Sequence, residues 1–360
     1  MELRRSPLHE DHFRQGCRMT ETDGWIMPLE FSGVFREYQA HRRSSVIWDA
    51  SNLGSIRVSG PGALDLLQTA FTNDLRRCEV GRSQYTFLLS EVDAGIIDDL
   101  MIWRVDTELF YLTPNRPEPV LRALRQLRKH DRHPPCDIED VSSDRVLLAL
   151  QGAQARERMA ELAPPAATMP ALRVRRMTLA GGDALVATTR FGGQVGFELH
   201  LTPPVARTVY RTLVARGVAP AGLGMRETHR LESGIPRYGF ELSTAVTPLE
   251  TGSSQAVSFG TDFLGRSALL ARRERGAQRL LRTIVMRTRQ VPTAGSDVLA
   301  GDERIGQVTS GNFSPRLHRG IGFAFVRPEE PPGSEVTVRT QRGGVAAEIV
   351  ATPIEFEAAR

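Results

Sequence analysis

The stretch Gln84–Ile102 constrains this chain most, because two adjacent aspartates interrupt apolar runs that otherwise indicate paired strands. Successive side chains of a strand alternate between its two faces, so Asp98 and Asp99 are expected to point in opposite directions. One of the two carboxylates should therefore face inward. An inward carboxylate without a nearby cation is costly, so such a position is typical of a hydrogen-bond network or of a functional site.

Strand-like and helix-like segments mix irregularly along the chain, which favours an α+β architecture over a regular βαβ repeat. We predict an antiparallel meander of three strands over residues 84–90, 97–105 and 108–113, followed by an amphipathic helix. Helical spacing returns from Val205 to Arg216, and Gly217 is placed to end that helix.

The 360 residues of the chain predict roughly two or three domains. From about Thr283 the sequence is rich in Val, Thr and Gly, with short alternating runs such as Glu335–Arg339. This composition predicts a small antiparallel barrel or sandwich at the C-terminal end.

Charge and cysteine content exclude several classes of protein. Lys and Arg number 46 against 42 Asp and Glu, the pI is near 9.3, and the excess is spread out, so we expect no nucleic-acid partner. Three separated cysteines without a C-x-x-C pair disfavour a disulfide framework or a metal site.

No run reaches the ~18 apolar residues of a membrane span, and the start lacks an apolar signal region, so we expect a cytoplasmic protein without membrane binding.

Four islands carry the functional signal, and each has a distinctive composition. They are Trp48–Leu53 preceded by Gly24–Leu29; Ala94–Asp99 with Tyr85 upstream; Arg190–Leu199 followed by Gly222–Gly234 and Arg237–Gly239; and Val308–Pro315. Their order and spacing resemble the glycine-cleavage T-protein (aminomethyltransferase) and its folate-dependent relatives, which include demethylating enzymes. The stretches "IIDDL", "GLGxRxxxRLExG" and "TSGNFSP" carry the resemblance, which runs from about Pro7 to the C-terminus.

The resemblance implies a three-domain α+β cloverleaf around a central channel for tetrahydrofolate or a one-carbon-substituted form of it. A discontinuous folate-binding domain would cover 1–53 and 140–275, and a second α+β domain with the Asp98–Asp99 motif would cover 54–139. A C-terminal antiparallel β-barrel would cover 276–360.

The resemblance also implies roles for individual residues. Asp99 would lie near the reacting folate nitrogen as the catalytic residue. Folate-binding positions carried over by motif are Tyr85, Asn115, Glu198, Arg226 and Tyr238.

The chemistry of these residue types fits the implied roles. A carboxylate such as Glu198 can accept two N–H groups from the edge of a pterin ring. Asp99 would stabilise positive charge that develops on a folate nitrogen and relay a proton. Taken without the family pattern, Asp99 fits a turn cap or an ion pair with arginine, and Glu198 fits an ordinary exposed strand residue.

Three departures from the family pattern surround the expected route of the donor substrate. Asn52 stands where the family has a histidine, Phe191 where it has a tyrosine, and Gln194 where it has a glutamate. An amide cannot titrate as an imidazole does, so acid–base chemistry at position 52 would be lost. We therefore expect retained folate binding and a specialised one-carbon transferase that acts on a different small-molecule donor or acceptor.

Two alternatives remain open. One is the glycine-cleavage aminomethyltransferase itself, which acts on a lipoyl carrier protein. The other is a non-enzymatic folate-binding relative such as the iron–sulfur-cluster assembly proteins of the same superfamily. The latter carry a signature cysteine, and Thr189–Gly196 contains none.

Overall fold

The computed structural model describes residues 3–130, 134–193, 195–341 and 343–354. The chain forms two compact units. The first comprises Met1–Leu88, Asp98–Arg226 and Ser258–Leu264, and the second comprises Leu89–Ile97, Glu227–Val257 and Gly265–Arg360.

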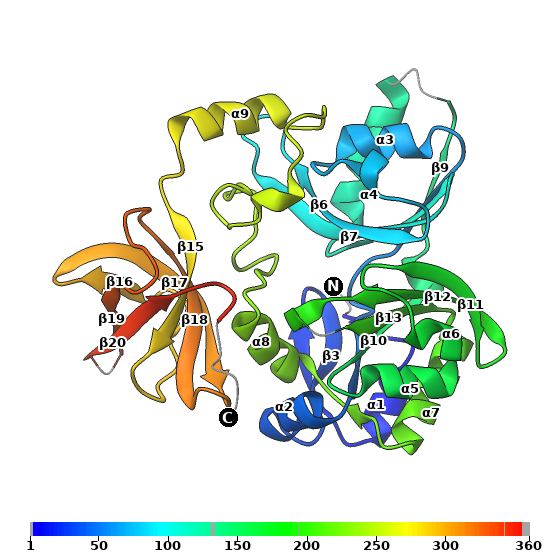
Figure 1. Cartoon of the computed structure of the whole chain (residues 1–360), viewed down its shortest axis with the longest axis horizontal. Coiled ribbons are helices and arrows are strands. Elements are labelled where there is room, and N and C mark those ends of the chain that lie inside the picture. The colour runs from blue at the N-terminus through cyan, green and yellow to red at the C-terminus, as the bar shows by residue number, and fades with distance from the viewer. Residues whose placement is uncertain (1–2, 131–133, 194, 342, 355–360) are drawn as a thin grey trace. The chain divides into compact units, whose positions relative to one another are not determined.

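The first unit contains a six-stranded sheet in the order β11-β12-β13-β10-β4-β14 (Figure 1). Its strands are β4 (Val46–Asp49), β10 (Val146–Gln151), β11 (Val174–Leu179), β12 (Gly182–Thr189), β13 (Gly196–Leu201) and β14 (Ala219–Pro220). Every residue of β10 is buried, and its first five residues form a continuous apolar run, as expected at the centre of a sheet.

Three helices accompany this sheet: α5 (Ala155–Leu162), α6 (Pro164–Ala167) and α7 (Pro203–Ala215). Helix α7 packs on β10 and β4, and its Val209 and Leu213 are fully buried. Gly217 adopts a φ of 85°, and the N–H of Val218 returns to the carbonyl of Leu213 at 3.0 Å. The predicted helix and its glycine stop are thus confirmed, because glycine adopts this left-handed conformation without strain.

A second sheet of the same unit has the strand order β6-β7-β8-β5-β9. Its strands are β5 (Ile56–Ser59), β6 (Arg82–Leu89), β7 (Ile96–Asp106), β8 (Leu109–Pro114) and β9 (Asp137–Asp140). Helices α3 (Ala63–Ala70) and α4 (Pro117–His130) cover one face of it (Figure 1). Strands β6, β7 and β8 are the predicted meander, and α4 is the predicted amphipathic helix, with Leu124 completely buried.

The first unit also holds a three-stranded sheet of order β1-β3-β2 and further helices. These elements are β1 (Arg4–Arg5), α1 (His9–Arg14), β2 (Arg18–Thr22), β3 (Trp25–Glu30), α2 (Val34–Arg43) and α8 (Leu223–Glu232), whose last six residues belong to the second unit.

The second unit is built on a closed six-stranded barrel in the order β15-β18-β17-β16-β19-β20 (Figure 1). Its elements are α9 (Arg266–Arg275), β15 (Leu280–Met286), β16 (Asp297–Ala300), β17 (Glu303–Ser314), β18 (Arg319–Val326), β19 (Glu335–Thr340) and β20 (Gly343–Val350). All its strand pairs are antiparallel, and a branched aliphatic core that includes Ile284, Val298, Val326 and Ile349 fills its interior.

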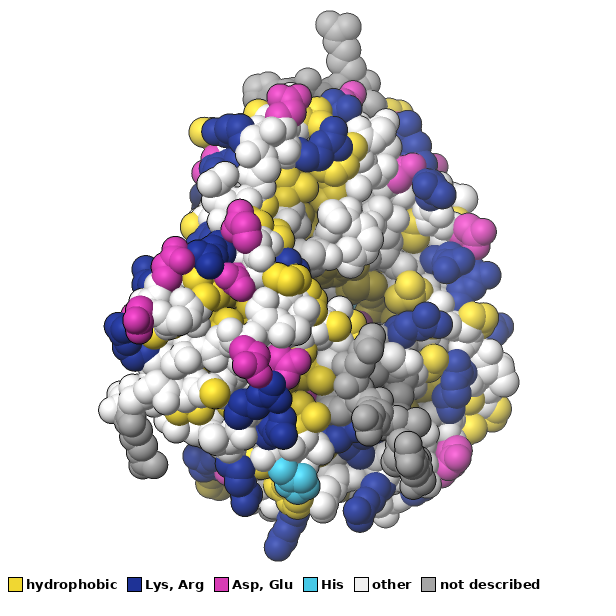
Figure 2. All heavy atoms as spheres, turned by 60° about the vertical axis from the view of Figure 1, so that its left-hand side comes forward, with side chains coloured by type: hydrophobic (Ala, Val, Ile, Leu, Met, Phe, Trp, Pro, Cys, Tyr) yellow, Lys and Arg dark blue, Asp and Glu magenta, His cyan; other side chains and the backbone are white. Residues whose placement is uncertain are grey.

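The mixed α+β fold and the C-terminal antiparallel barrel are therefore as predicted. The three-domain division and the central channel stay predictions. Among the described residues, no helix is both long and apolar enough to cross a membrane. On the face drawn in Figure 2, basic and acidic side chains are interspersed.

Candidate functional site

Asp98 and Asp99 lie on strand β7 with their side chains on opposite faces. Asp98 is completely buried on the same face as Leu100 and Ile102. Asp99 lies on the other face and remains partly exposed. The alternation places one carboxylate inside the protein, as the strand pattern predicts.

Hydrogen bonds from the chain that follows β8 satisfy the buried Asp98 carboxylate. It accepts the backbone N–H of Asn115 at 3.0 Å and that of Arg116 at 2.8 Å. The side-chain Nδ2 of Asn115 donates to the same carboxylate at 2.9 Å. A buried carboxylate is tolerated when donors replace its water, so Asp98 anchors this segment to β7.

Both oxygens of the Asp99 carboxylate are also held. The Tyr85 hydroxyl donates to Oδ2 at 2.9 Å, and Asn115 Nδ2 lies 2.9 Å from Oδ1. The Tyr85 ring packs edge-on against Phe87, with ring centroids 5.2 Å apart. Tyr85, Asp99 and Asn115, three of the predicted site residues, therefore lie in direct contact.

The surroundings shift the titration of both carboxyl groups. Burial and the neighbouring charge of Asp98 raise the pKa of Asp99 to about 7, against the lowering effect of the bonds from Tyr85 and Asn115. Burial likewise raises the pKa of Asp98, to about 6. A partly exposed carboxyl group that titrates near neutral pH is suited to proton transfer.

Glu198 occupies the middle of β13 in the other sheet. It lies directly between Ala149 of β10 and Ala187 of β12, and Trp48 of β4 continues the row beyond Ala149. The ring of Phe191 approaches Trp48, with centroids 6.3 Å apart. Paired residues of antiparallel strands share one face, so small side chains flank the Glu198 carboxylate and aromatic rings lie at its side.

The Glu198 carboxylate has no hydrogen-bond or ion-pair partner within the part of the chain that the structure describes. Burial raises its pKa to about 7, and the charge of Arg226 acts in the opposite direction. A half-buried carboxylate without donors is costly to the protein alone, and it is suited to accept N–H groups from a ligand.

His200 connects the two sheets on which Asp99 and Glu198 lie. It is two residues from Glu198 on β13, and its ring meets Trp103 of β7 and Tyr111 of β8 edge-on, at 5.8 and 5.0 Å between centroids. Trp103 is four residues from Asp99 and thus on the same face of β7. The faces that carry Asp99 and Glu198 therefore pack together inside the first unit.

His200 and Trp48 were not predicted as site residues. Burial lowers the pKa of His200 to about 3, so the ring is neutral, and its Nε2 lies 2.5 Å from the Ser55 hydroxyl. The two-residue spacing from Glu198 to His200 was the available sequence signal. This spacing indicates a site only when the contacts of His200 with the facing sheet are known.

The other predicted site residues lie outside the contacting group of Tyr85, Asp99 and Asn115. Asn52 follows β4, and its buried Oδ1 has no hydrogen-bond partner among the described residues. Arg226 lies on α8, where its charge acts on Glu198. Tyr238 belongs to the second unit and bridges to Leu242. Gln194 lies outside the described residues.

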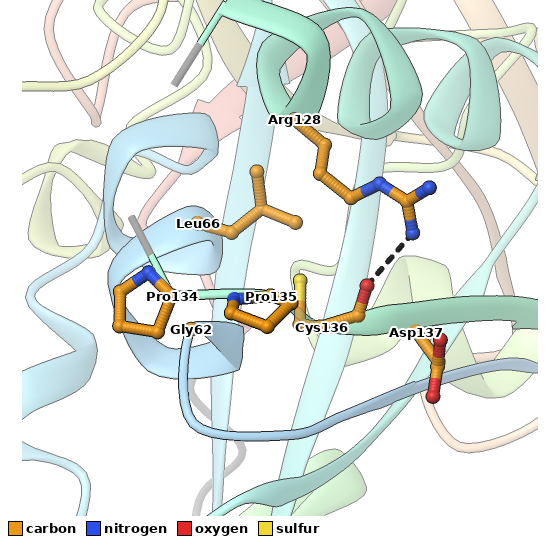
Figure 3. Close-up of a pocket in the computed structure, with 7 residues that line it drawn as sticks. All are labelled: Gly62, Leu66, Arg128, Pro134, Pro135, Cys136 and Asp137. Carbon is orange, nitrogen blue, oxygen red and sulfur yellow. Dashed lines mark hydrogen bonds between the residues drawn. The ribbon is translucent and has the colours of Figure 1, made fainter. Parts of the chain in front are cut away.

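A cavity of about 440 Å³ opens elsewhere in the first unit, between α3, α4 and the start of β9 (Figure 3). Its lining residues are Gly62, Leu66, Arg128, Pro134, Pro135, Cys136 and Asp137. Nη1 of Arg128 donates to the carbonyl of Cys136 at 2.7 Å (Figure 3). The lining includes none of the predicted folate residues, so this cavity is not the candidate site.

Comparisons with known proteins cover nearly the whole chain. Residues 8–261 match the GCVT N-terminal domain family, and residues 279–354 match the glycine cleavage T-protein C-terminal barrel domain family.

Curated relatives match over nearly their full length. An aminomethyltransferase of Rubrobacter xylanophilus is 38% identical over 98% of this chain and 94% of its own length. That of Thermus thermophilus is 36% identical over 98% and 99%.

A solved structure shows the same fold. The crystal structure of glycine cleavage system aminomethyltransferase T from Bartonella henselae superimposes with a TM-score of 0.91 at 28% identity, covering 98% of each chain. The domain matches and the full-length relatives together show that this chain belongs to the glycine-cleavage T-protein (aminomethyltransferase) family, a family of folate-dependent transferases.

Proposed function

We propose that the protein is a tetrahydrofolate-dependent aminomethyltransferase that takes an aminomethyl group from the lipoyl arm of a carrier protein. The observation that carries the proposal is full-length identity of 35–38% to relatives named aminomethyltransferase, from several bacterial groups. This support favours the glycine-cleavage activity over the specialised donor that the three sequence departures predict.

The described residues fit a folate. The Glu198 carboxylate has no donor of its own within the described chain, and its neighbours on either strand are alanines. It would accept the N–H groups of the pterin edge, and the nearby Arg226 charge would favour its ionised form. Binding would thus relieve the cost of this half-buried carboxylate.

When bound, tetrahydrofolate supplies the nitrogens that receive the one-carbon unit. Asp99 would face the site of transfer, with its carboxylate oriented by Tyr85 and Asn115. Its negative form would stabilise positive charge on the transferred group, because a fixed carboxylate needs no reorganisation during the reaction. A pKa of about 7 would also let it hold or release a proton near neutral pH.

A specialised relative is the second candidate. The observation that favours it is the buried Oδ1 of Asn52, which lacks a hydrogen-bond partner among the described residues. The resemblance implies that the family has a histidine at this position. An unmatched acceptor of this kind is suited to an N–H or O–H donor on a small-molecule substrate.

A comparison of one-carbon donors distinguishes the two candidate functions. The full-length protein is incubated with tetrahydrofolate and either an aminomethylated lipoyl carrier or a panel of small N-methyl and S-methyl compounds, and the folate product is identified by mass. Conversion with the carrier and none with the panel supports the aminomethyltransferase. Conversion with a panel compound but not with the carrier contradicts the aminomethyltransferase and supports the specialised relative.

A further inference from the structure

The two aspartates of β7 are joined through one amide. We propose that Asp98, Asn115 and Asp99 form a positioning relay, in which Asp98 fixes the amide of Asn115 and this amide orients the Asp99 carboxylate. The inference rests on the proposed role of Asp99 beside the reacting folate nitrogen, and it assigns Asp98 and Asn115 as positioning residues.

The first step of the relay is the attachment of Asn115. Asn115 is 17 positions from Asp98 in the sequence, and three hydrogen bonds fasten its segment to that carboxylate. One of them comes from the backbone N–H of Arg116, so the backbone and the side chain are both fixed. Asp98 is completely buried, so water does not compete for these bonds.

The second step is the use of the amide hydrogens. Nδ2 of Asn115 lies 2.9 Å from each of three acceptors, which are Asp98 Oδ1, Asp99 Oδ1 and the Asp99 carbonyl. An amide nitrogen carries two hydrogens, so these acceptors use its donor capacity completely. Only the amide oxygen of Asn115 remains for a ligand, which makes positioning of Asp99 the main task of this side chain.

The third part of the relay is the electrostatic effect of Asp98 and Asn115 on Asp99. The groups that face Asp99 are the Asp98 carboxylate on the same strand, the Tyr85 hydroxyl on β6 and the Asn115 amide after β8, and the Arg116 charge acts on Asp98. Repulsion by Asp98 outweighs each hydrogen bond in its effect on the pKa of Asp99. Removing the Asp98 charge should therefore ease ionisation of Asp99, whereas removing the Asn115 donor should hinder it.

The relay is tested by titrating the aspartate side chains of the full-length protein, labelled with ¹³C at Cγ, by NMR. The variants are Asp98→Asn and Asn115→Ala, and Asp99→Asn identifies the Asp99 signal. The Asp99 midpoint should fall in Asp98→Asn and rise in Asn115→Ala, each by about half to one pH unit. Limiting turnover at high pH, where Asp99 is ionised in every protein compared, should fall about tenfold or more in both variants because the carboxylate is less well oriented, while the Kd for tetrahydrofolate changes little.

Two matched variants control for loss of structure. Asp11→Asn removes another buried carboxylate, which pairs with Arg211 at 2.6 Å, and Asn312→Ala removes another amide, which donates to Thr228 at 3.0 Å. Both should lower stability and leave the Asp99 midpoint unchanged.

Equal midpoints in wild type, Asp98→Asn and Asn115→Ala would overturn the relay, and so would shifts in the same direction. If Asp98→Asn does not fold, Asn115→Ala decides alone: an upward shift supports the relay and no shift overturns it. Opposite shifts of the Asp99 midpoint in the two variants, with unchanged turnover, would support the relay. The same result would contradict the proposed role of Asp99 in transfer.

Discussion

Replacing Glu198 by glutamine should stabilise the ligand-free protein at alkaline pH and weaken folate binding at the same time. Burial raises the pKa of this carboxyl from 4.5 to about 7. The difference between pKa values of 4.5 and about 7 corresponds to at most about 3.4 kcal/mol of unfavourable charge burial, and partial exposure reduces this to about 1–2 kcal/mol.

The direction of this pH effect on stability follows from which form of the Glu198 carboxyl the folded state prefers. Because the folded pKa is raised, the folded protein favours the protonated carboxyl, and the penalty is absent below about pH 4.5. It grows as the pH rises towards about 7 and is constant above that. Glutamine at position 198 is neutral at every pH, so the variant should lack this loss of stability.

Urea unfolding of wild type and Glu198→Gln at pH 5 and pH 8 measures the effect. The variant should gain about 1–2 kcal/mol on wild type between the two pH values. Glu108→Gln, at an exposed turn between β7 and β8, is the matched control and should follow wild type. Parallel pH dependence of wild type and Glu198→Gln would refute the argument that this carboxylate is buried without compensation.

The same variant should bind tetrahydrofolate less tightly. Glutamine retains one acceptor and places an N–H group against the second pterin donor, so one charge-assisted hydrogen bond is lost. This loss of about 2–3 kcal/mol corresponds to a Kd about 30 to 150 times higher by calorimetry. Unchanged affinity would contradict the role of Glu198 in holding the pterin.

Three further outcomes are expected. Asp99→Asn should reduce turnover at least about a hundredfold with nearly unchanged folate affinity, and normal turnover in a stopped-flow assay would remove its proposed role. Wild-type turnover should rise with pH through about 7, as Asp99 ionises, and a rise of the same size in Asp99→Asn would show that another group titrates. Leu124→Ala, in the buried stripe of α4, should lower the free energy of unfolding by about 2–5 kcal/mol in urea, whereas the less buried Leu127→Ala should cost clearly less; equal losses would contradict the assigned packing of α4.

Local patterns predicted several elements of the first unit, including the strand that carries Asp98 and Asp99. The alternation on either side of Asp98 and Asp99 predicted β7 and its two faces, and Gly217 predicted the end of α7, because these features depend on neighbouring residues only. The closed order of the barrel strands was not predictable, since β15 pairs with β18 and β20 far along the chain.

The contacts of the site depend on the same long-range pairing. Asn115 reaches both aspartates because β7 pairs with β8, with Leu100 opposite Pro114. The alanines beside Glu198 become its neighbours only through the register of three strands. Residue types and the family resemblance identified Asp99 and Glu198 as candidates, but the donors around each carboxylate follow from the fold.

A single-turnover reaction tests the central proposal most directly. The protein is mixed with tetrahydrofolate and a lipoyl carrier that bears a ¹³C-labelled aminomethyl group, and ammonia and labelled folate are measured together. The proposed function requires ammonia and one-carbon folate in equal amounts, both dependent on tetrahydrofolate and both slowed by Asp99→Asn. Folate binding without either product would contradict the proposed aminomethyltransferase activity.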